Sequence, residues 1–159
     1  MITQNRLREL AHYCPETGQF THLQSKGRKK AGMPAGSMKP DGYVSIMFDG
    51  HRTMAHRFAW LYMIGEWPTQ EIDHMDGNKA NNAFANLRQV SRRTNTENKH
   101  TAKRTSTTGL LGVIRHPRGF VARIVSKGRR TYLGIFETPE AAHEAYVQAK
   151  RELHQGCTI

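Results

Sequence analysis

Along the first third of the chain, apolar and polar side chains follow the pattern of β-strands separated by turns. Residues 43–48 form a run of β-favouring side chains, and the pair Asp49-Gly50 that follows is typical of a tight hairpin. The next segment, 51–54, is therefore expected to pair with 43–48 as the second strand of the hairpin. Residues 1–55 as a whole are predicted to be rich in strands and turns.

The spacing of apolar residues becomes helical at residue 55. Phe58, Leu61 and Tyr62 stand at i, i+3 and i+4, which places them on one face of a helix. Gly65 can end this helix, because glycine adopts the left-handed conformation that many helix C-termini require. His56, near the start of the helix, is expected to be a packed or capping residue rather than a ligand.

The last third of the chain is predicted to form three short strands followed by a helix. The strands are expected at 111–115, 120–125 and 130–136. Thr138 can cap the helix, which is expected to end at Gly156. An apolar stripe on the helix would face the sheet. The stripe consists of Ala142, Ala145, Tyr146, Ala149 and Leu153.

Between these two regions, residues 99–108 are predicted to form a basic linker. The segment contains one alanine and no larger apolar side chain. It therefore buries too little surface to offset the entropy of ordering, although it could become ordered along a phosphate backbone. The chain is expected to have two parts, residues 1–98 and residues 109–159.

The net charge of the chain indicates which class of molecule it binds. The chain has 159 residues, with 24 Lys and Arg against 13 Asp and Glu, and its net charge is +11 at pH 7. Such an excess on a small chain, distributed over both halves, favours a polyanion such as nucleic acid. No apolar run approaches the roughly 20 residues of a membrane-spanning helix. No apolar N-terminal stretch follows a basic start, so a secretory signal is not expected.

The two cysteines, Cys14 and Cys157, are far apart and form no C-x-x-C pair. A disulfide framework and a Cys-rich zinc site are therefore excluded. A reducing compartment fits this cysteine usage, so the protein is expected in a cytoplasm.

Five consecutive residues, Lys26-Gly27-Arg28-Lys29-Lys30, form a basic cluster in the strand-rich region. One interpretation of the cluster is a solvated loop. The other is a contact with phosphate groups, and the sequence supports the two interpretations equally.

The segment 71–98 carries the candidate chemistry. It contains six asparagines in 28 residues, although asparagine has low propensity for both helices and strands. Asp73 and His74 are adjacent on a predicted strand, where their side chains point to opposite faces unless a strand end or bulge brings both to one site. A carboxylate suits a hard divalent cation, and a neutral imidazole can accept a proton near pH 7. With an asparagine oxygen from the following helix, these groups would make a metal-dependent site for phosphodiester hydrolysis.

This part of the chain resembles the HNH endonucleases, specifically the homing endonucleases encoded by phages and introns. The resemblance covers about residues 5–100. It implies a ββα-metal fold, in which two strands joined by a long loop are followed by a helix over one divalent metal. Residues 56–98 would form this core, and residues 1–55 the β-rich N-terminal part of the nuclease module. The matching residues are Tyr13, Pro15-Glu16-Thr17-Gly18, Phe20, Asp41-Gly42-Tyr43, His56-Arg57, Ile72-Asp73-His74, Asp76-Gly77-Asn78, Asn81-Asn82, Asn86-Leu87-Arg88, Ser91, Asn95 and Asn98.

The resemblance also implies roles for individual residues. His74 would be the general base, and Asp73 and Asn95 would hold the metal. Asn86 would tie the loop or orient His74 by hydrogen bonding. Because Asn95 stands where the family often has histidine, the sequence is a His-Asn-Asn variant, and this neutral ligand suits Mg²⁺ or Mn²⁺ better than Zn²⁺. Two further polar residues are expected outside the ligand set: Asp76 in a turn, and Asn98 in structure or DNA contact.

The C-terminal part, residues 109–159, resembles the AP2 DNA-binding domain. The resemblance rests on Gly112-Val113, Ala122, Ile124, Tyr132-Leu133-Gly134, Phe136, Thr138, Glu140-Ala141-Ala142 and Ala145-Tyr146. It implies a small sheet that enters the major groove of duplex DNA, where arginine reads guanine and pairs with phosphates. The alternative is a sheet-plus-helix core with a solvated basic face. The expected DNA-contacting residues are Arg92, Arg93, Lys103, Arg104, Arg115, Arg118, Arg123, Arg130 and Tyr132.

The sequence therefore predicts an α+β protein with two modules, a ββα-metal nuclease and a small AP2-like domain. Its expected function is divalent-metal-dependent cleavage of double-stranded DNA, biased toward particular sites as in homing enzymes. Two alternatives remain open: a DNA-binding regulator whose nuclease site has lapsed, and a toxin-like nuclease without site preference. The expected location is the cytoplasm of a bacterial or phage-infected cell.

Overall fold

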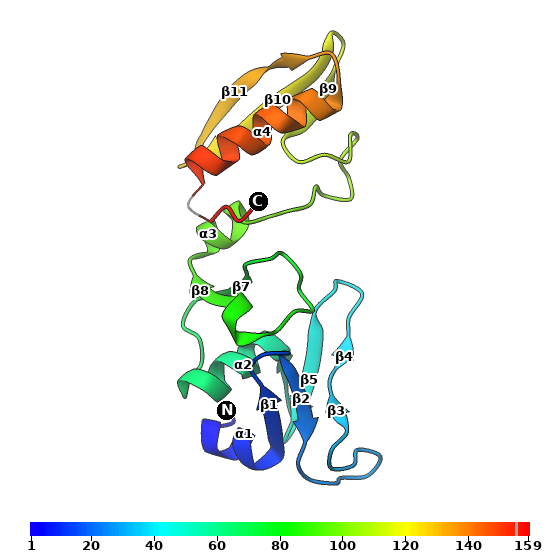
Figure 1. The fold of residues 1–159 in the computed structure, drawn as a ribbon, viewed down its shortest axis with the longest axis vertical. Helices are drawn as coiled ribbons and strands as arrows, with labels where there is room; N and C mark the ends of the chain where they lie inside the picture. Colours follow the sequence, from blue (N-terminus) through cyan, green and yellow to red (C-terminus); the bar gives the residue numbers. More distant parts are fainter. Residues whose placement is uncertain (155) are drawn as a thin grey trace. The chain divides into compact units, whose positions relative to one another are not determined.

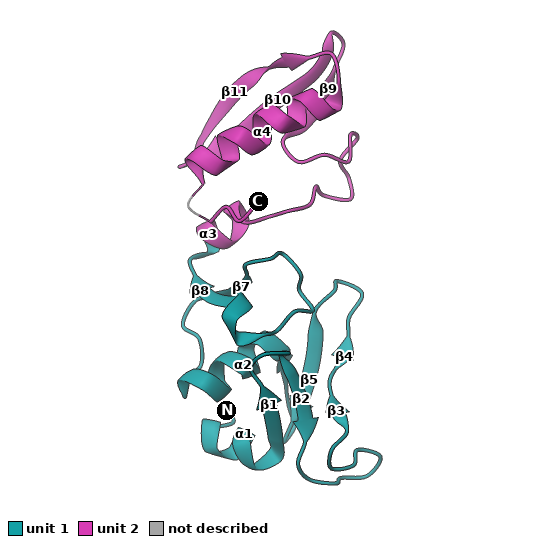
Figure 2. Ribbon diagram, viewed as in Figure 1, with its two compact units in different colours: residues 1–92 teal, residues 93–159 magenta. Residues whose placement is uncertain are grey.

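The computed structural model describes residues 1–154 and 156–159 and divides into two compact units, Met1–Arg92 and Arg93–Ile159 (Figure 2). Both units combine helices with small antiparallel sheets, so the protein is of mixed α and β class. The division falls after Arg92. Residues 93–98, which we expected at the end of the nuclease core, therefore belong to the second compact unit.

The first unit begins with a helix that the strand pattern did not predict. α1 (Gln4–Leu10) starts after Thr3, whose side chain accepts a hydrogen bond from a backbone N–H of the first turn. The helix has seven residues and a single buried side chain, so it lacks the apolar stripe that would reveal it. β1 (Ala11–Cys14), β2 (Gln19–His22) and β3 (Pro34–Ala35) follow as an antiparallel sheet in that order.

The predicted hairpin is confirmed. β5 (Val44–Phe48) pairs with β6 (His51–Met54), and β4 (Ser37–Met38) pairs with the other edge of β5. Asp49 and Gly50 have positive φ angles of +46° and +77°. Positive φ at both central residues is the conformation that a type I′ hairpin turn requires, and Gly adopts it at no steric cost.

The predicted helix at residue 55 is also confirmed. α2 (Ala55–Ile64) continues directly from β6. Gly65 adopts the left-handed conformation with φ +94°, and its N–H bonds to the carbonyl of Leu61. Phe58 and Leu61 are buried, and Tyr62 packs against the same core.

The segment with the candidate chemistry folds as strand, loop, strand and helix. β7 (Glu71–His74) and β8 (Leu87–Val90) form an antiparallel pair. A long loop joins them and ends in a short 3-10 helix, η1 (Phe84–Asn86). α3 (Arg92–Glu97) begins directly after Ser91. This order is the one that the resemblance to the nuclease family implies.

Three strands and a helix form most of the second unit (Figure 1). β9 (Val113–His116), β10 (Gly119–Ser126) and β11 (Arg129–Phe136) make an antiparallel sheet in the order β11-β10-β9, and α4 (Pro139–Leu153) packs on it. Thr138 caps α4 as predicted, because its side chain accepts a backbone N–H of the first turn. None of the helices in the described part of the chain is long and apolar enough to cross a membrane.

The apolar stripe predicted on α4 is confirmed except at its end. The residues of the stripe that are buried are Ala142, Tyr146 and Ala149. Leu153 was wrongly predicted to be part of the core, since it is 42% exposed, and the helix ends at this residue rather than at Gly156. At this end of α4, the buried residues are Lys150 and His154 instead. Their side chains donate hydrogen bonds to backbone carbonyls.

Aromatic rings form the centre of the first unit. Phe58 is completely buried, and its ring lies 5.4 Å from that of Phe48, 5.7 Å from that of Trp67 and 6.4 Å from that of Phe20. These rings come from α2, β2, β5 and the segment after α2. These rings therefore connect the sheets β1-β2-β3 and β4-β5-β6 to the helix that precedes β7.

Replacing Phe58 by Ala should lower the free energy of unfolding of the first unit by about 3–5 kcal/mol, because the substitution loses a buried ring and leaves a cavity. Met63, which is exposed on the same helix, is the matched position. Met63→Ala should change stability by about 0.5 kcal/mol or less. Urea denaturation followed by circular dichroism measures both changes. Equal losses from the two substitutions would contradict the central position of Phe58.

Candidate functional site

His74 is held at the end of β7 by residues from three other segments of the first unit. The side chain is buried, with 4% of the residue exposed. Its ring centre lies 5.0 Å from that of His56 on α2 and 6.0 Å from that of Tyr43. Its Nε2 atom lies 3.3 Å from Oδ1 of Asn82, in the loop that follows β7. The ring therefore has a defined orientation, and His56 is a packed residue, as expected.

The hydrogen bonds of Asn82 assign the tautomer of His74. The side-chain Nδ2 of Asn82 donates to the carbonyl of Ala80 at 2.9 Å, so Oδ1 is the amide atom that faces the ring. An amide oxygen only accepts hydrogen bonds, so Nε2 of neutral His74 carries the hydrogen and donates it. Nδ1 is then the basic nitrogen of the ring.

Burial favours the neutral form of both histidines. It lowers the pKa of His74 from its ordinary value, although the hydrogen bond to Asn82 and the charges of Asp76 and Asp73 act in the opposite direction. Burial, followed by the charges of neighbouring basic side chains, lowers the pKa of His56 to about 3. His74 is therefore present at neutral pH in the form that can accept a proton.

Hydrogen bonds among polar side chains hold the loop after His74 and explain its many asparagines. The Asp76 carboxylate accepts bonds from the backbone N–H of Asn78 at 2.8 Å and the side chain of Asn81 at 2.7 Å. Asn86 donates to the same carboxylate at 2.9 Å and accepts from the Asp76 N–H at 3.0 Å. Burial would raise the pKa of Asp76, but these bonds outweigh it and lower the pKa. Asp76 is thus a turn residue.

Asn86 makes the contacts expected of a residue that ties the loop. Besides its bonds with Asp76, its side chain donates to the carbonyl of Asn81 at 2.9 Å. The asparagine whose side chain bonds to the His74 ring in this loop is Asn82. The sequence pattern indicates no role for Asn82 beyond its place in the motif.

The N-terminal part of the motif supports the same loop. The Tyr13 hydroxyl donates to the carbonyl of Asn82 at 2.7 Å, and the Pro15 carbonyl accepts the N–H of Phe84 at 2.8 Å. Gly18 has φ +71° and lies so close to the loop that a Cβ atom would be 2.1 Å from the backbone of Asn82. Only glycine fits there. The turn between β1 and β2 therefore fixes the residue that bonds to His74.

Residues 41–43 close another side of the site. The Lys79 ammonium donates to the carbonyl of Asp41 at 3.0 Å and lies 4.8 Å from the centre of the Tyr43 ring. The Tyr43 ring in turn packs against His56 at 5.4 Å. The sequence alone indicated no role for Tyr43 or Lys79. The feature that could have pointed to Tyr43 was its place in the Asp41-Gly42-Tyr43 motif.

Asp73 is the buried neighbour of His74 on β7, with 6% exposed. Its Oδ2 atom accepts hydrogen bonds from Nε and Nη2 of Arg88 at 3.0 and 2.9 Å. Arg88 faces Asp73 directly across the β7–β8 pair. A carboxylate has two oxygens and about four lone-pair positions, so it can accept an arginine and still ligate a cation. Arg88 orients this carboxylate, a role that the motif alone did not reveal.

Asn95, the other predicted ligand, lies on α3 within the second compact unit and is half-buried. Arg92 and Arg93 on this helix are exposed, and Arg93 pairs with Glu97 at 2.9 Å. Asn98, just after the helix, is 3% exposed, and its Oδ1 lies 3.2 Å from Nε2 of His100. This burial is what a structural role for Asn98 requires.

Basic residues gather on one face of the sheet in the second unit. Arg123 pairs in register with Tyr132, and Arg130 pairs with Val125. These four residues are exposed, whereas the alternate residues of β10 pack toward α4. With Lys103 from the segment 99–108, Arg123 and Arg130 line a hollow of about 340 Å³, and the described lining includes no acidic side chain. Four of the predicted DNA-contacting residues thus lie on one surface. They are Lys103, Arg123, Arg130 and Tyr132.

Three other predicted residues lie apart from this hollow. Arg115 pairs in register with Phe120, which packs on the α4 side of the sheet, and its guanidinium lies 5.6 Å from the centre of that ring. Arg118 is exposed in the turn between β9 and β10. Arg104 is exposed in the segment 99–108 and does not line the hollow.

Comparison with known proteins shows that part of the chain is similar to one family. Residues 53–97 match the model of the HNH endonuclease family. They include α2, β7, the loop, β8 and α3, so the matched segment contains His74, Asp73 and Asn95.

One solved structure and the curated proteins complete the comparison. A structure of DNA binding and cleavage by the HNH homing endonuclease I-HmuI is 28% identical over 55% of this chain and 49% of that chain, with a TM-score of 0.43. The matched region thus spans about half of that protein. No curated protein gives a significant match.

The buried His56 should make folding stability depend on pH. An unfolded histidine titrates near pH 6.5, whereas the pKa of His56 in the folded protein is about 3. Below pH 6.5 the unfolded chain therefore binds the proton that the folded chain excludes, and stability is lost as the pH falls. We expect His56 to contribute a loss of about 1.5 kcal/mol between pH 6.5 and pH 5.

Urea denaturation at several pH values tests this dependence. His56→Phe should make stability fall less steeply with decreasing pH, because the substituted ring does not titrate. His12, an exposed histidine on β1, is the matched position, and His12→Phe should leave the pH dependence unchanged. The same slope in His56→Phe and the natural protein would show that His56 titrates normally.

Proposed function

We propose that the protein is a divalent-metal-dependent endonuclease that hydrolyses phosphodiester bonds in double-stranded DNA. One observation carries the proposal: in the segment that matches the HNH endonucleases, a neutral His74 is held by Asn82 and directly follows Asp73 on β7. A buried, oriented imidazole with its basic nitrogen defined is what a general base requires.

In the proposed reaction, Nδ1 of His74 takes a proton from a water molecule as the water oxygen bonds to phosphorus. The bond between phosphorus and the leaving oxygen breaks, and that oxygen receives a proton from solvent. Asn82 accepts the Nε2 hydrogen and so stabilises the imidazolium that forms. Asn86 acts through the loop and is a positioning residue.

Asp73 and Asn95 are the proposed ligands of Mg²⁺ or Mn²⁺. Among residues 1–154 and 156–159, no three His, Cys, Asp or Glu side chains gather as a metal site. One carboxylate and one amide, completed by water and phosphate oxygens, form the kind of site that Mg²⁺ uses. When bound, the ion would neutralise charge on the phosphate and on the leaving oxygen.

The second unit is proposed to bind duplex DNA through an AP2-like sheet. The support is the basic hollow formed by Lys103, Arg123 and Arg130, with the exposed Tyr132 beside Arg123. Phosphate contacts would supply affinity, and arginine contacts to base edges would bias the enzyme toward particular sites, as in homing enzymes. Further phosphate contacts are proposed for Arg92, Arg93, Arg104, Arg115 and Arg118.

Nicking of supercoiled plasmid tests the catalytic assignment. In Mg²⁺, His74→Ala should lower the nicking rate by about 10²–10⁴-fold, because general-base catalysis contributes this much. Binding of DNA in EDTA should be unchanged, and EDTA should abolish nicking by the natural protein. Exposed His51 is the control position, and His51→Ala should nick normally. Equal rates for His74→Ala and the natural protein would contradict the assignment.

Arg130→Ala should weaken DNA binding about tenfold, since one well-placed arginine contact is worth about 1–3 kcal/mol. Single-turnover cleavage of DNA already bound should remain unchanged, because the hollow is not the reacting site. The neighbouring Arg129 is exposed but does not line the hollow, so Arg129→Ala is the matched control. Fluorescence anisotropy in EDTA measures the affinities, and an equal loss from both variants would count against the hollow as the contact surface.

Mapping the cleaved ends separates the remaining alternatives. A few discrete cleavage positions would support a site-biased enzyme. A smear of positions would support a non-specific, toxin-like nuclease. Tight binding without cleavage in Mg²⁺ or Mn²⁺ would support a DNA-binding regulator with a lapsed site.

A further inference from the structure

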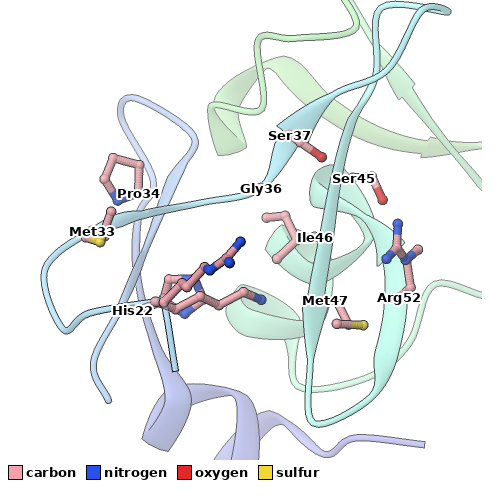
Figure 3. Close-up of a pocket in the computed structure, with 11 residues that line it drawn as sticks. His22, Met33, Pro34, Gly36, Ser37, Ser45, Ile46, Met47 and Arg52 are labelled. Atoms are coloured by element: carbon pink, nitrogen blue, oxygen red, sulfur yellow. The ribbon is translucent and has the colours of Figure 1, made fainter. Parts of the chain in front are cut away.

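A second basic hollow lies in the first unit, away from His74. It has a volume of about 370 Å³ and opens between the sheet β4-β5-β6 and the segment that joins β2 to β3. Figure 3 shows the side chains around it. Its lining includes His22, Arg28, Lys29, Met47 and Arg52.

The hollow is positively charged. Arg28 and Lys29 reach it from the basic cluster of residues 26–30, and Arg52 reaches it from β6. The described lining includes no aspartate or glutamate. Asp49, which lines a neighbouring hollow, is paired with Arg6 at 2.7 Å. The positive charges of Arg28, Lys29 and Arg52 are therefore suited to binding an anion from outside the chain.

His22 gives the hollow a buried polar wall. The residue is 8% exposed, and its ring packs edge-on against Phe48 at 5.5 Å. Its ring lines the hollow and can donate a hydrogen bond to an acceptor bound there.

We propose that this hollow binds a backbone phosphate of the DNA substrate. The inference rests on the proposed function, since it assumes that DNA is the substrate. Arg28, Lys29 and Arg52 supply positive charge, and a ring N–H of His22 donates to a phosphate oxygen. Met47, at the rim and 40% exposed, is placed to contact a sugar. For Arg28 and Lys29, the proposal therefore selects phosphate contact over a solvated loop as the role of the basic cluster.

Two substitutions and a matched control test the site. Lys29→Gln and Arg52→Gln each remove one positive charge from the lining, and the two residues are distant in sequence. Lys30→Gln removes the same charge from the same turn, but Lys30 is exposed and outside the lining. All three positions are at the surface, and thermal unfolding checks that each variant folds.

Duplex DNA binding is measured by fluorescence anisotropy over a series of KCl concentrations in EDTA. Each lining substitution should reduce the slope of log K against log [KCl] by about 1, the contribution of one phosphate contact. Lys30→Gln should keep the natural slope. Ethylation interference should mark the contacted phosphate, and the mark should disappear in both lining variants.

Unchanged slopes in Lys29→Gln and Arg52→Gln, or an equal loss in Lys30→Gln, would overturn the phosphate site. So would binding of inorganic phosphate that depends on Lys29 without any effect on DNA, since that result marks a site for a free anion. If slopes change but the natural protein never nicks DNA, the phosphate site stands and the nuclease proposal fails. If the protein nicks DNA but the slopes do not change, only the phosphate site fails.

Discussion

The hydrogen bond between His74 and Asn82 is the constraint on which the first unit is organised. A buried histidine loses solvation, so a hydrogen bond to a fixed partner is needed to compensate. The loop residue Asn82 is fixed because the Tyr13 hydroxyl bonds its carbonyl and Gly18 lies against its backbone. The N-terminal sheet, which carries no proposed catalytic residue, therefore determines the orientation of the base.

In each unit, burial and charge give different groups of residues different chemical properties. In the first unit, burial favours a neutral His74, and Arg88 orients the carboxylate beside it. The basic hollow of the same unit is lined by other elements, so affinity for phosphate and proton transfer are separable. In the second unit, α4 covers one face of the sheet and leaves Arg123 and Arg130 exposed on the other. A sheet with one buried face and one charged face is suited to reading a polyanion.

The elements with strong local patterns were predicted correctly. The hairpin at 49–50 depends on two residues with positive φ, and α2 depends on helical spacing and a terminal glycine. α1 was missed because one buried side chain makes no periodic pattern. Leu153 was misplaced because periodicity gives the face of a helix but not where the covering sheet ends. Lys150 and His154 fill that end through bonds to carbonyls, which no apolar pattern can indicate.

By itself the sequence determined the residue types of the candidate site, since Asp73, His74 and the ordered asparagines define a chemistry through their identity and spacing. Only the tertiary structure decided which asparagine touches the histidine, which nitrogen is basic and which basic residues share a surface. The reason is physical. A hydrogen bond depends on distance and direction over a few ångströms, and Tyr13, Gly18 and Tyr43 reach the loop across long separations in the chain. Spacing along a strand or helix describes neighbours only within that element.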